Sequence, residues 1–128
     1  MNIAITDGIK VSVVWRYRPN HSFPSKGMFI YSYHVIIENN SPSTVQLLRR
    51  HWYITDSNGT VREVEGEGVI GEQPIIQPGE IHEYESACDL RTDIGSMKGT
   101  YLMMKIHEKK TFEVTIPEFI LSAPFKMN

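Results

Sequence analysis

The stretch MFIYSYHVIIEN, residues 28–39, decides the fold class. Its bulky residues recur at every second position, which is the side-chain period of a β-strand and not of a helix. One face collects the large apolar side chains, which are Phe29, Tyr31, Tyr33, Val35 and Ile37. The opposite face carries Ser32, His34 and Glu38. The alternation therefore predicts a strand that is buried on one side and exposed to solvent on the other.

The same alternation continues along most of the chain, and no long helical pattern interrupts it. Further strands are predicted at residues 9–18, 45–57, 60–65, 83–88, 100–107 and 111–117. Asn58-Gly59 predicts a hairpin, and Pro78-Gly79 predicts a turn before the strand at 83–88. Residues 95–99 and 22–24 are interpreted as loops. Without a crossover helix, parallel pairing is disfavoured, so about seven strands predict an all-β antiparallel sandwich.

The strand at 45–57 is predicted to supply the centre of the core. Its alternation places Leu48, Trp52 and Ile54 on one face, with Arg50 as the odd member. A tryptophan in the third strand of a sandwich commonly lies between the two sheets, so we expect Trp52 to be buried.

Length and charge limit the functional classes. The chain has 128 residues, which suits one domain spanning 1–128, with a core at about 9–121 and short tails. The net charge of −2 provides no basic field, so we expect no nucleic-acid partner. No apolar run approaches a membrane span, and Met1–Lys10 lacks the pattern of a signal peptide. We therefore expect no membrane insertion and a cytoplasmic location.

The sharpest local motif is the GxGxxG string formed by Gly66, Gly68 and Gly71. In a dinucleotide-binding fold such glycines let backbone N–H groups approach a pyrophosphate at a helix N-terminus. Here residues 74–79 leave no helix after the loop, which excludes that fold. A glycine loop can also cup an anion without a helix, with Arg49 and Arg50 as the candidate cations. The competing interpretation is a loop that crosses between sheets and uses glycine for unusual backbone angles.

Other site chemistry has less support. Glu65, Glu67 and Glu72 offer three carboxylates for a Mg²⁺ or Ca²⁺ ion, although solvated glutamates are the commoner case. The five histidines show no metal-site spacing, and the single cysteine, Cys88, lies inside a predicted strand. Since no nucleophile and base are paired in the sequence, we predict no catalytic residues, no cofactor and no enzymatic activity.

Several stretches resemble the ApaG family. They are MFIYSYHVIIEN (28–39), VQLLRRHWYITD (45–56), VEGEGVIGEQP (64–74), QPGE (77–80), GSMKGTYLMM (95–104) and FEVTIPEFIL (112–121), in family order. The resemblance implies a fibronectin type III-like, immunoglobulin-like sandwich. It also implies a link, through the bacterial name, to cobalt and magnesium efflux, and a domain shared with eukaryotic F-box and polymerase-interacting proteins. Pyrophosphate binding, discussed for the family's glycine motif, would fall on Gly66, Gly68 and Gly71. Glu108-Lys109-Lys110 stands where a glycine turn is common in the family, which puts the type of that turn in doubt.

The leading hypothesis is a non-enzymatic binding module for a protein partner, using a sheet edge or one face of a sheet. A homodimer through the same edges stays open. The alternative is a small-ligand sensor that binds a phosphate, a nucleotide or a divalent cation at residues 66–71.

Overall fold

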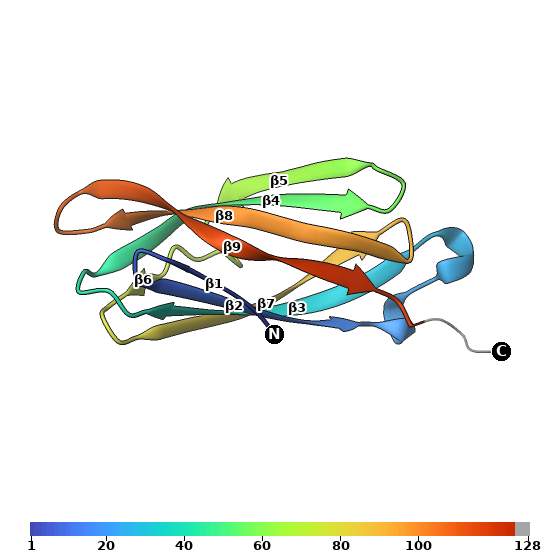
Figure 1. Ribbon diagram of the computed structural model, residues 1–128, viewed down its shortest axis with the longest axis horizontal. Helices are drawn as coiled ribbons and strands as arrows, with labels where there is room; N and C mark the ends of the chain where they lie inside the picture. The colour runs from blue at the N-terminus through green and yellow to red at the C-terminus, as the bar shows by residue number, and fades with distance from the viewer. Residues whose placement is uncertain (125–128) are drawn as a thin grey trace.

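Residues 1–124, which the computed structural model describes, form nine strands and two single-turn 3-10 helices (Figure 1). The elements are β1 (Asn2–Thr6), β2 (Ile9–Tyr17), η1 (Pro19–His21), η2 (Pro24–Lys26), β3 (Phe29–Asn39), β4 (Val45–Asp56), β5 (Val61–Glu67), β6 (Ile75–Ile76), β7 (Ile81–Leu90), β8 (Ile94–Lys105) and β9 (Lys110–Ser122). In this part of the chain, no helix is long and apolar enough to cross a membrane.

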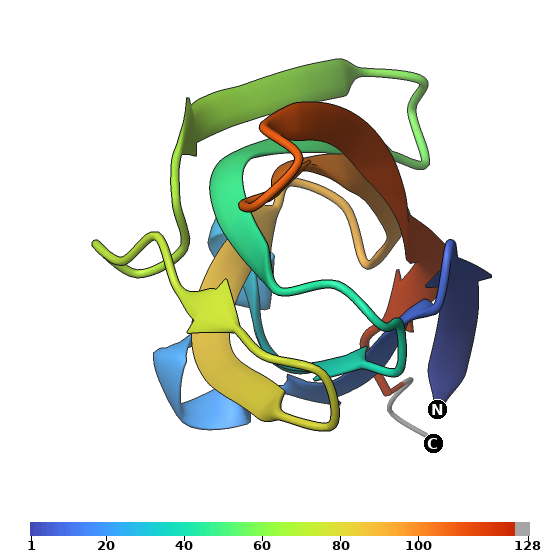
Figure 2. The same cartoon turned by 90° about the vertical axis from the view of Figure 1, so that its left-hand side faces the viewer.

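The strands form two antiparallel sheets that pack face to face (Figure 2). The first sheet has the order β1-β2-β3-β7, and we call it sheet A. The second has the order β5-β4-β8-β9, with β6 also paired to β4, and we call it sheet C. The predicted all-β sandwich is confirmed, and its architecture is consistent with a fibronectin type III-like fold.

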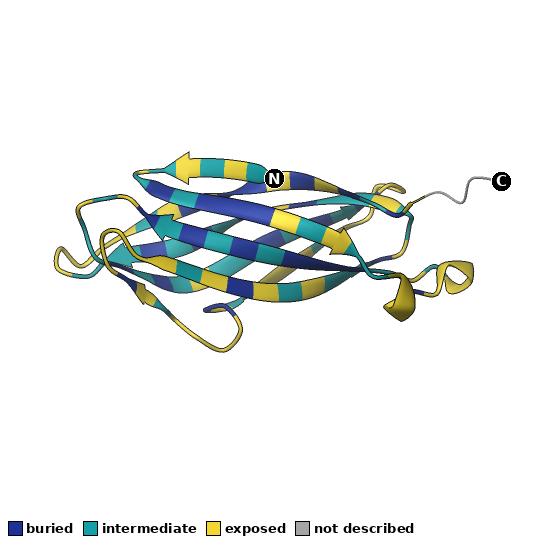
Figure 3. Cartoon of the chain, turned by 90° about the horizontal axis from the view of Figure 1, so that it is seen from below, coloured by how far each residue is buried: buried dark blue, intermediate teal, exposed yellow. Residues whose placement is uncertain are grey.

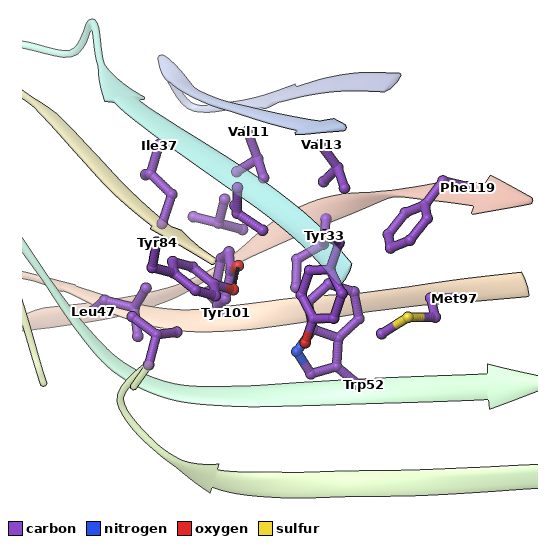
Figure 4. Packing of buried hydrophobic residues seen from close by; sticks show 14 of the residues in the cluster. Val11, Val13, Tyr33, Ile37, Leu47, Trp52, Tyr84, Met97, Tyr101 and Phe119 are labelled. Carbon is purple, nitrogen blue, oxygen red and sulfur yellow. Dashed lines mark hydrogen bonds between the residues drawn. The ribbon is translucent and has the colours of Figure 1, made fainter. Parts of the chain in front are cut away.

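The core lies between the sheets, where the inward faces of the strands meet. Trp52 is only 2% exposed, which confirms its predicted position. Its ring packs edge-on against Tyr33 from sheet A, with ring centroids 5.3 Å apart, and against Phe119 from β9 at 6.1 Å (Figure 4). The hydroxyl groups of Tyr84 and Tyr101 form a buried hydrogen bond between the two sheets. Aromatic rings and this polar link therefore hold the layers together.

Two predictions about strand boundaries are wrong. Residues 95–99 are not a loop but the beginning of β8, because Gly95 and Gly99 let the β4 backbone approach closely. A Cβ at Gly99 would overlap the carbonyl oxygen of His51. Before the predicted first strand, β1 adds an edge to sheet A through a turn at Asp7 and Gly8, both at positive φ. Together with β6, β1 brings the predicted seven strands to nine.

The predicted assignment of the β4 side chains to the core and to the outer face is wrong before Arg49 and right from Arg49 onward. The pairing of β4 with β8 shifts between Leu47 and Arg49, so Leu48 is the extra residue of a β-bulge. A bulge reverses the alternation of side chains on its strand. Leu47, and not Leu48, is therefore the fully buried partner of Trp52 in the core.

Replacement of Trp52 by Ala should destabilise the protein by about 3–5 kcal/mol, because it removes a ring that both sheets contact. Chemical denaturation measures this change. Tyr53→Ala, on the outer face of the same strand, is the control and should cost clearly less. A loss below about 1 kcal/mol for Trp52→Ala would contradict a core position.

Lys109 has a φ of 53°, a left-handed conformation that costs an L-residue roughly 1–2 kcal/mol. Lys109→Gly should therefore raise the free energy of unfolding by about 0.5–1 kcal/mol, after the larger chain entropy of glycine is subtracted. Thermal unfolding of the variant checks this. Lys110→Gly, one residue along in β9, should lower stability instead.

Candidate functional site

The two candidate cations, Arg49 and Arg50, point to opposite faces of β4. Arg50 shares the inner face with Trp52, whereas Arg49 is exposed on the outer face with His51. The bulge at Leu48 precedes both residues, so the alternation from Arg49 onward is regular. The structure therefore does not place both guanidinium groups on one side of the glycine motif.

Arg50 fixes the first part of the glycine motif. One terminal nitrogen of its guanidinium, Nη1, donates to the carbonyl oxygens of Glu67 and Gly68, each at 3.0 Å. Gly66 pairs with Arg50 across the β4–β5 ladder, and a Cβ at Gly66 would lie 2.8 Å from Nη2. The glycine therefore leaves room for the guanidinium to cross the end of β5.

The second part of the motif is a tight turn. The N–H of Gly68 donates to the carbonyl of Leu48 at 2.8 Å, so it is directed at β4. Val69 and Glu72 exchange two backbone hydrogen bonds, and Ile70 and Gly71 between them have φ values of 47° and 73°. Two consecutive positive φ values are typical of a type I′ turn. Here Gly68 and Gly71 supply unusual backbone angles, whereas Gly66 does not.

The outer face of β4 and β5 carries a histidine between two carboxylates. His51 Nε2 lies 2.8 Å from Glu63 Oε1, and His51 Nδ1 lies 2.9 Å from Glu65 Oε1. A carboxylate only accepts hydrogen bonds, so the ring makes both bonds as a donor when both nitrogens carry protons. Both glutamates are largely exposed, and such surface pairs contribute little to stability.

A hollow of about 180 Å³ adjoins this histidine. Its lining includes Arg49, Arg50 and His51 together with the carboxylates of Glu65 and Glu113, but none of the three glycines. The anion hypothesis of residues 66–71 thus stays a prediction, with both arginines among the lining residues and Arg50 already bonded to carbonyl groups.

The side chains of the proposed metal ligands, Glu65, Glu67 and Glu72, do not come together as a metal site. Glu65 contacts His51, and Glu72 contributes its backbone to the turn with Val69. Within residues 1–124, no group of three or more His, Cys, Asp or Glu side chains is arranged to hold a metal ion. The metal hypothesis therefore gains no structural support.

Cys88 lies in β7 with its side chain largely buried. Burial raises the pKa of its thiol to about 12, and the neighbouring charge of Asp89 acts in the same direction. The thiol is therefore protonated at neutral pH, and a protonated thiol is a poor nucleophile.

Comparison with known proteins agrees with this architecture. A family model described as the ApaG domain matches residues 19–105. Protein ApaG of Brucella canis is 46% identical over 124 residues, which cover 97% of this chain and 95% of the relative. Protein ApaG of Anaeromyxobacter dehalogenans is 44% identical over the whole length of both chains. The chain belongs to the ApaG domain family.

Solved structures extend the comparison of ApaG folds. A crystal structure described as the ApaA protein of Bordetella pertussis matches with a TM-score of 0.87 and 44% identity, covering 92% of this chain and 95% of that one. The C-terminal domain of wzt matches with a TM-score of 0.54 at 9% identity, covering 95% of this chain and 77% of that one, and so shares the fold alone.

Alanine substitutions should separate the roles of the three glycines in this ApaG domain. Gly68→Ala should be the most destabilising, because its φ is 63° and a Cβ there would overlap the carbonyl oxygen of Glu72. Gly71→Ala should cost about 1–2 kcal/mol for the positive φ alone, since nothing lies within 4 Å of its Cβ position. Gly66→Ala should displace the Arg50 side chain.

Denaturant unfolding of the three variants gives the order. Equal losses at Gly68 and Gly71 would contradict the overlap at Gly68. For Gly66, the double variant Arg50→Ala with Gly66→Ala should lose little more than Arg50→Ala, because the two changes remove the same contacts.

Proposed function

We propose that this ApaG domain is a non-enzymatic protein-binding module. Its contact surface is residues 61–72, which comprise β5 and the turn that follows it, and we call this surface the β5 edge. The observation that carries the proposal is an open strand edge that continues directly into an exposed isoleucine in a strained conformation. The partner is a protein that contributes an extended segment to sheet C.

β5 has one edge that pairs with β4 and one edge that is free to pair with an added strand. Within the described residues it pairs only with β4. Asp56 N donates to Thr60 O, and Gly68 N donates to Leu48 O, so even-numbered residues of β5 direct their backbone groups at β4. In an antiparallel ladder the directions alternate, so Val61, Glu63 and Glu65 direct their N–H and C=O groups outward. These outward groups are the template for an added strand.

The edge formed by β9 is less open. Strand β1 lies beside β9, and two of its side chains bond to the β9 backbone. Asn2 Nδ2 donates to the carbonyl of Glu118 at 3.0 Å, and Thr115 N donates to the hydroxyl of Thr6 at 3.1 Å. At β7, Arg62 donates to the carbonyl of Asp89. Side chains thus occupy backbone groups at these edges. Arg50 does the same at the carbonyl of Glu67, so the docking edge that we propose on β5 is the part that holds Val61, Glu63 and Glu65.

Ile70 adds an apolar contact at the end of the β5 edge. Its side chain is 60% exposed and its φ is 47°, although β-branched residues rarely adopt positive φ. The loop projects from the side of the molecule (Figure 2). Asparagine would serve the turn with less strain, so the fold itself does not need an isoleucine there. Strained residues of this kind cluster at active sites, ligand clamps and switch regions, so the backbone angle of Ile70 supports a functional role for this residue.

The charges on β5 define the partner segment. Glu63, Glu65 and Glu67 alternate along the outer face of the strand and are all exposed. A segment with Lys or Arg at alternate positions would complement this row. Two copies of β5 would instead set two glutamate rows side by side, and like charges across a strand pair are destabilising. A heterologous basic segment is therefore favoured over a homodimer through β5.

The family resemblance adds one expectation to this proposal, which is that the partner takes part in cobalt and magnesium efflux. The cytoplasm stays the expected location of the complex. The high pKa of Cys88 also supports a binding role over nucleophilic catalysis.

Glu65→Pro tests strand addition. Proline removes the outward N–H of residue 65 while the ladder with β4 remains, since proline is tolerated on the open side of an edge strand. The matched control is Glu65→Ala, which loses the same carboxylate and keeps the N–H. In a titration with a peptide of alternating Lys and Val, followed by amide shifts of β5, we expect binding to weaken about tenfold more in Glu65→Pro than in Glu65→Ala.

The outcome that contradicts strand addition is equal binding by the two variants, or binding of an alternating Glu and Val peptide as tight as that of the basic one. Light scattering over a concentration series measures self-association independently.

Ile70→Asn separates stability from binding. Since asparagine tolerates positive φ, the variant should be as stable as the parent or more stable by up to about 1 kcal/mol. Capture of partner proteins from native lysate should nevertheless fall, because the apolar contact is lost. A destabilised variant, or a stable variant that captures the same proteins equally well, would contradict the role given to Ile70.

A further inference from the structure

The outer face of sheet A points away from the core and contains a second concave region. The glycine motif is not part of this sheet, because it begins in β5 of sheet C. Its floor is formed by two small residues that pair across β3 and β7, Ser32 and Ala87. Longer side chains from the neighbouring strands rise around them, so the face is hollowed there. Figure 3 shows this face of the sheet, with exposed and buried residues alternating along its strands.

Two adjoining cavities occupy the hollow, with volumes of about 140 Å³ and 360 Å³. They share three lining residues, which are Arg18, Ser32 and Glu85. Arg16 and His34 line the smaller cavity only, and His21 lines the larger cavity only. The hollow is therefore large enough for a small molecule and is bordered mainly by groups that donate hydrogen bonds.

One of the two arginines is held in place. Arg18 Nε donates to Ser32 Oγ at 2.8 Å, and Ser32 is only 8% exposed. This bond uses one donor of the guanidinium, and the terminal nitrogens remain for a ligand. A guanidinium that is anchored at Nε is preorganised, so less side-chain freedom is lost when an anion binds.

The two arginines that line the hollow are not neutralised by ion pairs within the described residues. Within residues 1–124, Arg16 and Arg18 form no ion pair, and Arg16 makes no side-chain hydrogen bond. His34 contacts Glu83 at 3.4 Å. Glu85 is the only carboxylate that lines either cavity. Two arginines against one glutamate leave an excess of positive charge in a chain whose net charge is −2.

We propose that this hollow binds a phosphate group, with Arg16 and Arg18 as its cationic ligands. Guanidinium groups bind phosphate oxygens by charge-assisted hydrogen bonds, and two of them match the charge of a dianion. The smaller cavity takes the phosphate. The larger one adjoins it and has room for the substituent of a phosphate monoester.

The test is a calorimetric titration of the full chain at constant ionic strength, with inorganic phosphate and with phenyl phosphate as the probes. Amide shifts recorded in parallel locate the site. We expect saturable binding with shifts at Ser32, His34 and Ala87. The probe that binds more tightly shows whether the site prefers free phosphate or a phosphate monoester as its ligand.

Variants that each remove one charge test which residues bind the phosphate. Arg16→Gln and Arg18→Gln should each weaken binding at least about tenfold, because each removes a charge-assisted bond. Glu85→Gln should tighten binding about two- to threefold, because it removes a screened repulsion. Arg91→Gln is the matched control, an exposed arginine that lines neither cavity, and should bind as the parent does. Arg49→Gln reports separately on the glycine motif.

Three results would overturn the proposal. They are no saturable binding at millimolar phosphate, a loss in Arg91→Gln equal to the losses in Arg16→Gln and Arg18→Gln, and a loss confined to Arg49→Gln with shifts at residues 66–71. The last result would place the anion at the glycine motif. Far-UV circular dichroism and the amide spectrum of each variant confirm that the comparison is between folded proteins.

Discussion

The extra residue at Leu48 is the constraint on which the core and the candidate surface of sheet C depend. Each residue of β4 after the bulge faces opposite to the direction that a regular strand starting at Val45 would give it. Trp52 consequently enters the core with Leu47, and Arg50 enters the same face at the margin of the core. His51 and Arg49 are sent outward by the same shift. Without the bulge, the strand would direct either its tryptophan or its first apolar residues to solvent.

Arg50 points inward, and its charge is stabilised there by hydrogen bonds to the end of β5. The guanidinium lies near three tyrosines, where its positive charge opposes the rise in pKa that burial causes at Tyr33, Tyr84 and Tyr101. A charged group at such a margin needs partners, and the carbonyls of Glu67 and Gly68 supply them. Gly66 is required because any side chain would occupy the space of the guanidinium. The motif that resembles a phosphate loop in sequence thus has a structural use at each of its positions.

Sequence patterns predicted the fold well and the site less well, for physical reasons that differ. The alternation at residues 28–39 and the Asn58-Gly59 turn reflect local geometry, so the strands and hairpin they predict are present. β1 was missed although Asp7-Gly8 is a hairpin signal between alternating isoleucines, because the preceding strand is only five residues long. The bulge at Leu48 has no marker, since any residue type can be the extra one. The facing of Leu47 and Leu48 was therefore beyond prediction, whereas the facing of Arg49 and Arg50 relative to Trp52 follows from the alternation and is confirmed.

The glycines of β8 show why tertiary contacts overrule local patterns. Gly95 and Gly99 suggest a loop when read alone, because glycine weakens a strand. In the structure the same absence of a Cβ lets β4 and β8 lie close at Thr55 and His51. That approach fixes β4 at the centre of sheet C and leaves β5 as the strand at its margin.

The position of β5 at the margin of sheet C determines which surfaces are left for partners. β9, at the opposite margin, is partly covered by the side chains of β1, and this contact also holds the two sheets together on that side. On the other side Arg62 reaches from β5 to Asp89 of β7, and Asn39 of β3 donates to the carbonyl of Ile76 in β6. The Nε of Arg62 is buried and has no hydrogen-bond partner among the described residues. An added strand on β5 would extend sheet C beyond β7 without disturbing the side that β1 closes. The proposed addition of a partner strand therefore rests on the difference between the β9 margin, which β1 partly covers, and the β5 margin, which pairs only with β4 among the described residues.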